Sequence, residues 1–271
     1  MGTGPLTRAA AAAGATAVAA AGLLTAQALE ARRRIGPRTT TAPYADGRYG
    51  SGPGTSIRLA VLGDSGAAGL GAARPEDTMG AILAVALSEV SGRTVTLSNH
   101  AVIGAQTADL QGQIDRALWT RPHVAVVMIG ANDVTHLVPR AISARRLRQA
   151  VARLRDSGTE VVVATCPDLG TVKPVPQPLR TVMRRSSRKL AAAQADATLA
   201  EGGRPVSLGS RLGPEFDERP DVMFAEDRFH PSTEGYAAAA QALLPEVIAA
   251  WRLGGEGEIL PALTTDSDVT Y

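Results

Sequence analysis

The stretch that decides the fold is IRLAVLGDS, residues 57–65. Its first six positions form a mostly apolar run that stops at a glycine. Short runs of this kind are typical of strands that are buried on both faces of a parallel sheet. We therefore expect a buried strand that ends in the turn Gly63-Asp64-Ser65. The residues that follow such a strand lie at the ligand-binding edge of the sheet.

Strand-like and helix-like segments alternate after this stretch. The expected strands are 57–62, 94–97, 124–129, 160–165 and 205–208, and the expected helices are 76–90, 141–155, 179–199 and 232–251. The strands are apolar and rich in β-branched residues, and the helices carry apolar residues at helical spacing. This alternation predicts an α/β fold: a three-layer α/β/α sandwich of the flavodoxin-like type with a central parallel sheet.

Composition excludes several functional classes. The 271 residues suffice for one sizeable domain with extensions. With 28 Lys and Arg against 26 Asp and Glu, and only three Phe, two Trp and four Tyr, the chain has neither the charge nor the aromatic surface of a nucleic-acid-binding protein. Cys166 is the single cysteine, which excludes an intramolecular disulfide and a cysteine-rich zinc site. We expect no nucleic-acid partner.

Polar residues follow the first three expected strands. Ser65 stands directly after the first strand, where a nucleophile would be exposed, but its hydroxyl needs a base and a site that stabilises an anion. Gly104 follows the second strand and could offer a backbone N–H, and Asn132 follows the third and could offer its amide. Each of these signals, taken alone, also fits an ordinary turn.

Two familiar motifs are absent around the first turn. The sequence GAAGLG at 66–71 does not meet the pattern G-x-G-x-x-G, and no acidic residue ends the second strand, so a dinucleotide site is not indicated. The turn also differs from the G-x-S-x-G elbow of α/β-hydrolases. We therefore expect no cofactor.

A carboxylate and an imidazole lie three residues apart before the last helix. Asp227 and His230 share one loop, so the carboxylate can orient the ring and stabilise its protonated form. The same spacing would also suit a metal-ligand pair or a surface turn. The rival pair with this spacing is Asp133 and His136.

Together, the pieces Gly-Asp-Ser, Gly, Gly-x-Asn-Asp and Asp-x-x-His-Pro resemble, in this order, the SGNH (GDSL) hydrolase family of esterases and lipases. The resemblance covers residues 57–252. It implies the SGNH-hydrolase form of the fold and a serine esterase that acts on small acyl or lipid-like esters. It assigns the nucleophile, orienting carboxylate and base to Ser65, Asp227 and His230, and the oxyanion hole to Ser65, Gly104 and Asn132. No cofactor or metal is implied.

Other functions remain open. An acyltransferase or deacetylase of the same fold would use the same residues. A non-catalytic protein could keep the sheet and a pocket for lipid or carbohydrate. A metal-dependent hydrolase could use Asp64, Asp227 and His230. The proline-rich segment 168–180 is expected to form a rim loop over the site, but its sequence does not indicate which acyl group the site binds.

The N-terminus is expected to lie outside the fold. Residues 9–29 carry no charge and are mostly Ala, and a helix of this length just spans a bilayer core of roughly 30 Å. They fit a signal peptide cleaved after Ala26-Gln27-Ala28, or an anchor whose following Arg32-Arg33-Arg34 holds the domain on the cytoplasmic side. A soluble Ala-rich helix is the alternative. We expect membrane association or export, with the side of the membrane left open.

This interpretation divides the chain into four parts. They are a hydrophobic segment at 1–31, a flexible linker at 32–56, a catalytic domain at 57–254 and a loose tail at 255–271.

Overall fold

The computed structural model describes residues 5–35 and 41–256. The strands are β1 (Gly47–Tyr49), β2 (Ile57–Gly63), β3 (Val95–Asn99), β4 (Val124–Met128), β5 (Glu160–Ala164) and β6 (Arg204–Val206). The α-helices are α1 (Pro5–Ile35), α2 (Ser65–Ala68), α3 (Met79–Ser91), α4 (Leu110–Leu118), α5 (Ala131–Thr135), α6 (Arg140–Asp156), α7 (Leu179–Ala200), α8 (Leu208–Glu218), α9 (Pro220–Met223) and α10 (Thr233–Trp251). Shorter turns of helix are η1 (Pro75–Asp77), η2 (Thr107–Asp109), η3 (Leu169–Thr171) and η4 (Arg252–Glu256).

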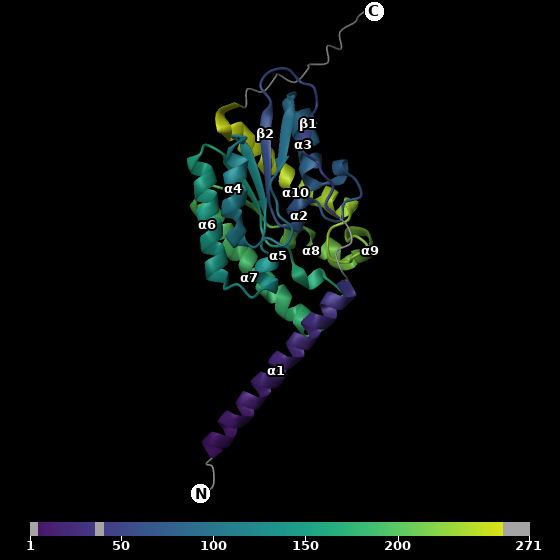
Figure 1. Cartoon of the computed structure of the whole chain (residues 1–271), viewed down its shortest axis with the longest axis vertical. Helices are drawn as coiled ribbons and strands as arrows, with labels where there is room; N and C mark the ends of the chain where they lie inside the picture. The colour runs from purple at the N-terminus through teal and green to yellow at the C-terminus, as the bar shows by residue number, and fades with distance from the viewer. Residues whose placement is uncertain (1–4, 36–40, 257–271) are drawn as a thin grey trace, which may run out of the picture.

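The six strands form one sheet in the order β1-β3-β2-β4-β5-β6. All neighbours pair in parallel except β1, which runs antiparallel to β3. Helices cover both faces, with α3 and α10 on one side and α4, α6 and α7 on the other (Figure 1). The prediction of a three-layer α/β/α sandwich is confirmed.

Strand β2 shows why the sheet is buried on both faces. Leu59 and Val61 point into the core formed with α3 and α10, whereas Ala60 and Leu62 point into the core formed with α4 and α6. All four side chains are buried. An uninterrupted apolar run is therefore what this strand requires, because successive side chains alternate between the two cores.

The flexible linker expected at 32–56 is corrected in two places. Helix α1 continues to Ile35, because no glycine or proline lies between Leu23 and Ile35 and Glu30 pairs with Arg34 one turn later at 3.0 Å. Within the predicted linker, β1 pairs with β3 through Gly47, Arg48 and Tyr49. This edge strand has no apolar run, so the sequence pattern did not reveal it.

Helix α1 projects from one end of the body, and its last turns rest on it (Figure 1). Ala31 is buried against Val172, Val175 and Phe224. The Gln27 side chain accepts a hydrogen bond from the backbone N–H of Leu179 at 2.9 Å. Among residues 5–35 and 41–256, none of the helices combines the length and apolar character that crossing a membrane requires. Membrane contact through 9–29 stays a prediction, and most of the predicted tail lies outside the described residues.

Candidate active site

Ser65 begins helix α2 directly after the buried strand β2. The N–H of Gly66 donates to the Asp64 carboxylate at 3.1 Å, so Asp64 caps the helix. Gly63 has a φ of 141°, and a Cβ there would lie 1.8 Å from the carbonyl oxygen of Met128. Only glycine therefore fits at the end of the strand, and the tight turn places Ser65 at the edge of the sheet.

Asp227 and His230 lie in the loop between α9 and α10. The loop closes on itself, because the N–H of Ala225 donates to the carbonyl of His230 at 2.8 Å. Ser232 caps α10 by accepting a hydrogen bond from the N–H of Gly235 at 3.1 Å. The loop is thus fastened on both sides of the histidine.

The three predicted catalytic residues form one hydrogen-bonded chain. His230 Nε2 lies 2.9 Å from Ser65 Oγ, and His230 Nδ1 lies 2.5 Å from Asp227 Oδ2. Ser65 and His230 are 5% and 3% exposed, so water does not compete strongly for these contacts. The arrangement can pass the hydroxyl proton of Ser65 to a ring whose tautomer is set by the carboxylate.

Asp227 is held in its ionised form. Burial alone would raise the pKa of Asp227, but hydrogen bonds from the His230 ring and from two backbone N–H groups outweigh it, and the pKa lies below its usual value. Asp227 Oδ1 accepts those two bonds from Phe229 and His230, each at 2.9 Å. A carboxylate that stays charged stabilises the imidazolium that forms when His230 takes a proton.

Of the predicted oxyanion residues, Gly104 lies in the loop after β3 and Asn132 in the first turn of α5, and these two segments are tied together. Asn132 donates from Nδ2 to the carbonyl of Ala105 at 3.0 Å, and Asp133 accepts from the N–H of Thr107 at 3.0 Å. Gly104 has a φ of 84°, a left-handed conformation that favours glycine. The segment before it is attached to the end of β2, since the N–H of Val102 donates to Gly63 at 3.1 Å.

Neither the rival Asp133–His136 pair nor the metal site suggested for Asp64, Asp227 and His230 is formed in the structure. The Asp133 side chain is fully buried and bonds to the loop after β3, whereas His136 is exposed and bonds to the carbonyl of Asn132 at 2.8 Å. Over the described ranges 5–35 and 41–256, no three or more His, Cys, Asp or Glu side chains come together as a metal site would require. Asp64, Asp227 and His230 therefore do not form the cluster on which the metal-dependent alternative depends.

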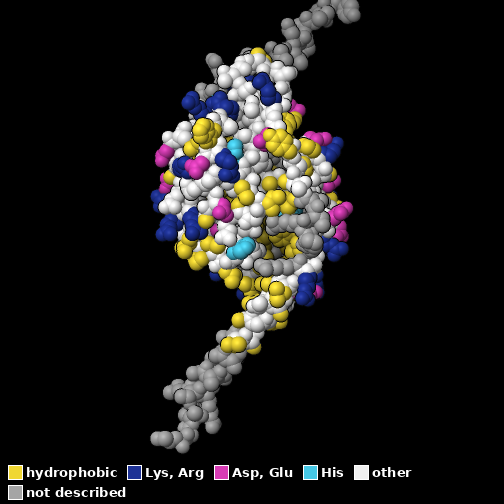
Figure 2. Space-filling model, in the orientation of Figure 1, with side chains coloured by type: hydrophobic (Ala, Val, Ile, Leu, Met, Phe, Trp, Pro, Cys, Tyr) yellow, Lys and Arg dark blue, Asp and Glu magenta, His cyan; other side chains and the backbone are white. Residues whose placement is uncertain are grey.

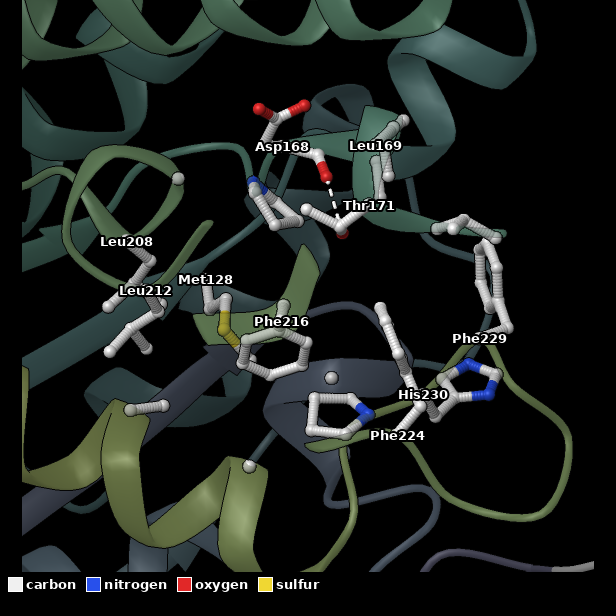
Figure 3. A pocket seen from close by; sticks show the side chains of 18 of the residues that line it. Met128, Asp168, Leu169, Thr171, Leu208, Leu212, Phe216, Phe224, Phe229 and His230 are labelled. Carbon is white, nitrogen blue, oxygen red and sulfur yellow. Dashed lines mark hydrogen bonds between the residues drawn. The ribbon is translucent and has the colours of Figure 1, made fainter. Parts of the chain in front are cut away.

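An apolar cavity of about 110 Å³ opens beside Ser65 and His230. Its walls come from β4, η3, α8, the loop of His230 and α10, and include Met128, Leu169, Val172, Leu208, Leu212, Phe216, Phe224, Phe229 and Ala239. All three phenylalanines of the chain line it. Figure 2 shows hydrophobic side chains in a hollow near the base of α1, and Figure 3 shows the labelled side chains around the cavity. Most of the side chains that line the cavity are therefore apolar.

The predicted rim loop forms one wall of this cavity. Its first residue, Asp168, is buried, accepts from the N–H of Gly170 at 2.8 Å and pairs with Arg188 at 2.8 Å. Leu169 and Val172 then face the cavity. The segment is therefore fastened at its start to α7.

Two buried glutamines support the site and carry no sequence signal of their own. Gln113 binds both polar groups of Gly63, accepting from its N–H at 2.7 Å and donating to its carbonyl at 2.8 Å. Gln194 links the ends of β4 and β5, donating to the carbonyl of Ile129 at 3.0 Å and accepting from the N–H of Cys166 at 2.7 Å. Each lies far in sequence from the residues it holds. The apolar cavity could have been suspected from the sequence, because all three phenylalanines fall within residues 216–229.

The chain resembles known esterases over most of its length. Residues 61–238 match the GDSL-like lipase/acylhydrolase family. A GDSL-like esterase of Mycobacterium tuberculosis is 42% identical over 233 residues, which cover 82% of this chain and 74% of that protein.

Solved structures agree in fold. An acetylxylan esterase from Geobacillus stearothermophilus superposes with a TM-score of 0.55 at 20% identity, covering 72% of this chain and 95% of that one. An α/β hydrolase from the metagenome of Lake Arreo in Spain gives a TM-score of 0.55 at 19% identity, covering 73% and 96%. With the family match and the mycobacterial relative, these findings show that the chain is an esterase of the GDSL-like lipase/acylhydrolase (SGNH) family.

Proposed function

We propose that this esterase hydrolyses carboxylic esters of apolar acyl groups through an acyl-enzyme on Ser65. The observation that carries the proposal is the hydrogen-bonded chain from Ser65 through His230 to Asp227, which opens directly into a cavity lined by all three phenylalanines. The cavity would take the acyl chain, because burying each methylene there contributes about 0.8 kcal/mol.

The proposed reaction runs in two halves. Ser65 Oγ bonds to the ester carbonyl carbon while its proton passes to His230 Nε2, and the carbonyl oxygen becomes negatively charged. The N–H groups of Ser65 and Gly104 and the Asn132 amide stabilise that charge. The carbon–oxygen bond to the alcohol then breaks, and the alcohol leaves with the proton from His230. In the second half water attacks the acyl-enzyme, giving its proton to His230, and Ser65 recovers a proton as the acid departs.

Two related activities would use the same groups. An acyltransferase would let an alcohol take the place of water in the second half, and a deacetylase would act on an acetyl group. One of the solved structures with this fold is named as an acetylxylan esterase. The apolar cavity favours a longer acyl group here, since an acetyl group would leave most of it unfilled.

The test is the variant Ser65→Ala. We expect it to keep the fold and Tm of the wild type and to lose all turnover of p-nitrophenyl butyrate. A fluorophosphonate probe should label the wild type covalently and leave the variant unlabelled, which separates an activated serine from the alternative of a non-catalytic lipid-binding or carbohydrate-binding protein. Retained hydrolysis in the variant would refute the assignment.

We also propose that residues 9–29 bring the full-length chain to a membrane, as an anchor or as a cleaved signal. Support comes from the uncharged run itself and from the three arginines that follow it. Cell fractionation tests this: we expect full-length protein with the membranes, or exported protein that begins at Leu29. Uncleaved protein in the soluble cytoplasmic fraction would contradict the proposal.

A further inference from the structure

A second cavity, of about 440 Å³, lies next to the apolar one and has a different character. Its lining residues are Arg34, Lys173, Pro174, Pro220, Asp221, Phe224 and Arg228. Phe224 lines both cavities, so the two spaces are adjacent.

Three cationic side chains from three distant segments meet in this cavity. Arg34 comes from the end of α1, Lys173 from the segment after η3, and Arg228 from the loop of His230. Among the lining residues that the structure describes, Asp221 is the single carboxylate, so this part of the lining carries more positive than negative charge.

The three cations differ in how far they are neutralised. Arg34 pairs with Glu30 at 3.0 Å, and Lys173 pairs with Asp217. Within residues 5–35 and 41–256, Arg228 makes no ion pair. A cation that faces a cavity without a counter-ion is available to an anionic ligand.

Arg228 is also held in an unusual backbone conformation. Its φ is 57°, in the left-handed region that long side chains rarely adopt. The turn arises because Asp227 Oδ1 accepts hydrogen bonds from the N–H groups of Phe229 and His230. Phe229 and His230, which follow in the same turn, line the apolar cavity, whereas Arg228 lines the second cavity.

In the proposed reaction, the alcohol portion of the ester is the part that would reach the second cavity. His230 must deliver its proton to the departing alcohol oxygen, so the alcohol lies close to His230. Arg228, two residues before His230 in the same loop, lines the second cavity. The acyl chain occupies the apolar cavity, which shares Phe224 with the second cavity. We propose that the second cavity binds a phosphate or carboxylate group carried by the alcohol portion of the ester, with Arg228 and Arg34 as its main partners. This inference rests on the proposed function and narrows its substrate class.

Two matched substrate pairs test the inference on the full-length protein. The first pair is 1-butyrylglycerol and 1-butyrylglycerol 3-phosphate, and the second is propyl butyrate and the butyryl ester of 3-hydroxypropanoate. The readout is the ratio of kcat/KM for the anionic ester to kcat/KM for its neutral partner, measured by titrating the acid released. In the wild type we expect a ratio of about ten or more for at least one pair, because a hydrogen bond to a charged group contributes on that order. The pair that shows it identifies phosphate or carboxylate as the preferred group.

Variants connect the ratio to the cavity. Arg228→Asn removes the charge and keeps a residue that tolerates the left-handed region, and Arg34→Ala removes a second cation far from the triad in sequence. We expect both to lower the ratio toward one, and added salt to lower it in the wild type. Arg33→Ala, at an exposed neighbour of Arg34 that does not line the cavity, is the matched control and should keep the wild-type ratio.

The outcomes separate this inference from the proposed function. A wild-type ratio near one for both pairs, with both neutral esters hydrolysed, would overturn the anion site and leave the esterase proposal standing. A high ratio that neither Arg228→Asn nor Arg34→Ala lowers would also overturn it. Failure of the wild type to hydrolyse any of the four esters would overturn both.

Discussion

Truncating Phe216 should change which acyl chains the enzyme prefers. Phe216 lines the apolar cavity and packs edge-on against Phe224, with ring centroids 4.8 Å apart at 77° (Figure 3). The change Phe216→Ala removes this ring and extends the cavity. Each further methylene that enters the space contributes about 0.8 kcal/mol, or roughly fourfold in kcat/KM. Two further methylenes should therefore raise kcat/KM for the longer esters by roughly 15-fold over the wild type.

The assay is kcat/KM on p-nitrophenyl esters of increasing acyl length, from acetate to decanoate. We expect the optimum to move to longer chains by about two carbons, with little gain for acetate. Phe216 is only partly buried, so the loss of stability should stay below the roughly 3–5 kcal/mol typical of a fully buried phenylalanine. Tyr44→Ala, at an aromatic side chain that is 79% exposed, is the control and should leave the profile unchanged. An unchanged or shortened optimum in Phe216→Ala would refute the assignment of this cavity to the acyl chain.

Three further outcomes are expected. Asn132→Ala should lower kcat by about 10²–10³ with a smaller change in KM, as for the loss of one oxyanion donor, and an unchanged kcat would remove Asn132 from that role. Gln113→Leu removes the side-chain partner of the Gly63 N–H, so urea unfolding should show the free energy of unfolding lowered by about 1–3 kcal/mol; a smaller loss would mean that the two hydrogen bonds contribute little to stability. The pKa of Asp227 is lower in the folded protein than its unfolded value of about 3.8. The ionised carboxylate therefore contributes fully to stability above that unfolded pKa, and the contribution is lost as the pH falls through the folded pKa. The difference in Tm between wild type and Asp227→Asn should therefore shrink below about pH 4, and a difference that stays constant on further acidification would contradict this.

The central strands could be predicted because their apolar runs are unbroken, as both faces of the sheet require. Ser65 could be placed for the same reason, since a buried strand that ends at Gly63 leaves the next residues at the sheet edge. Asp227 and His230 could be paired because three residues in one loop bring them within reach of each other. The contact from His230 to Ser65 spans 165 residues and followed only from the order of motifs along the chain.

Other features depend on contacts that no local pattern encodes. Strand β1 exists because its backbone pairs with β3, and its residues show no apolar alternation. Helix α8 contains Pro214 together with glycines, which ordinarily argue for a loop, yet it supplies Leu212 and Phe216 to the cavity. Gln113 and Gln194 are polar residues on helices, and only the fold reveals that their side chains hold the ends of the strands beside the site.

The loop that carries His230 explains how chemistry and substrate selection can be coupled in this chain. Asp227 and His230 bind each other, Phe229 lines the apolar cavity, and Arg228 lines the charged one. A single turn, closed by the carboxylate of Asp227, sets the directions of all of them. A substitution that relaxes this turn should therefore disturb the base and both substrate contacts together, whereas changes in α8 or α1 should alter one substrate contact and spare the base. Specificity can then diverge through α8 and α1 while the loop itself stays constrained by the reaction.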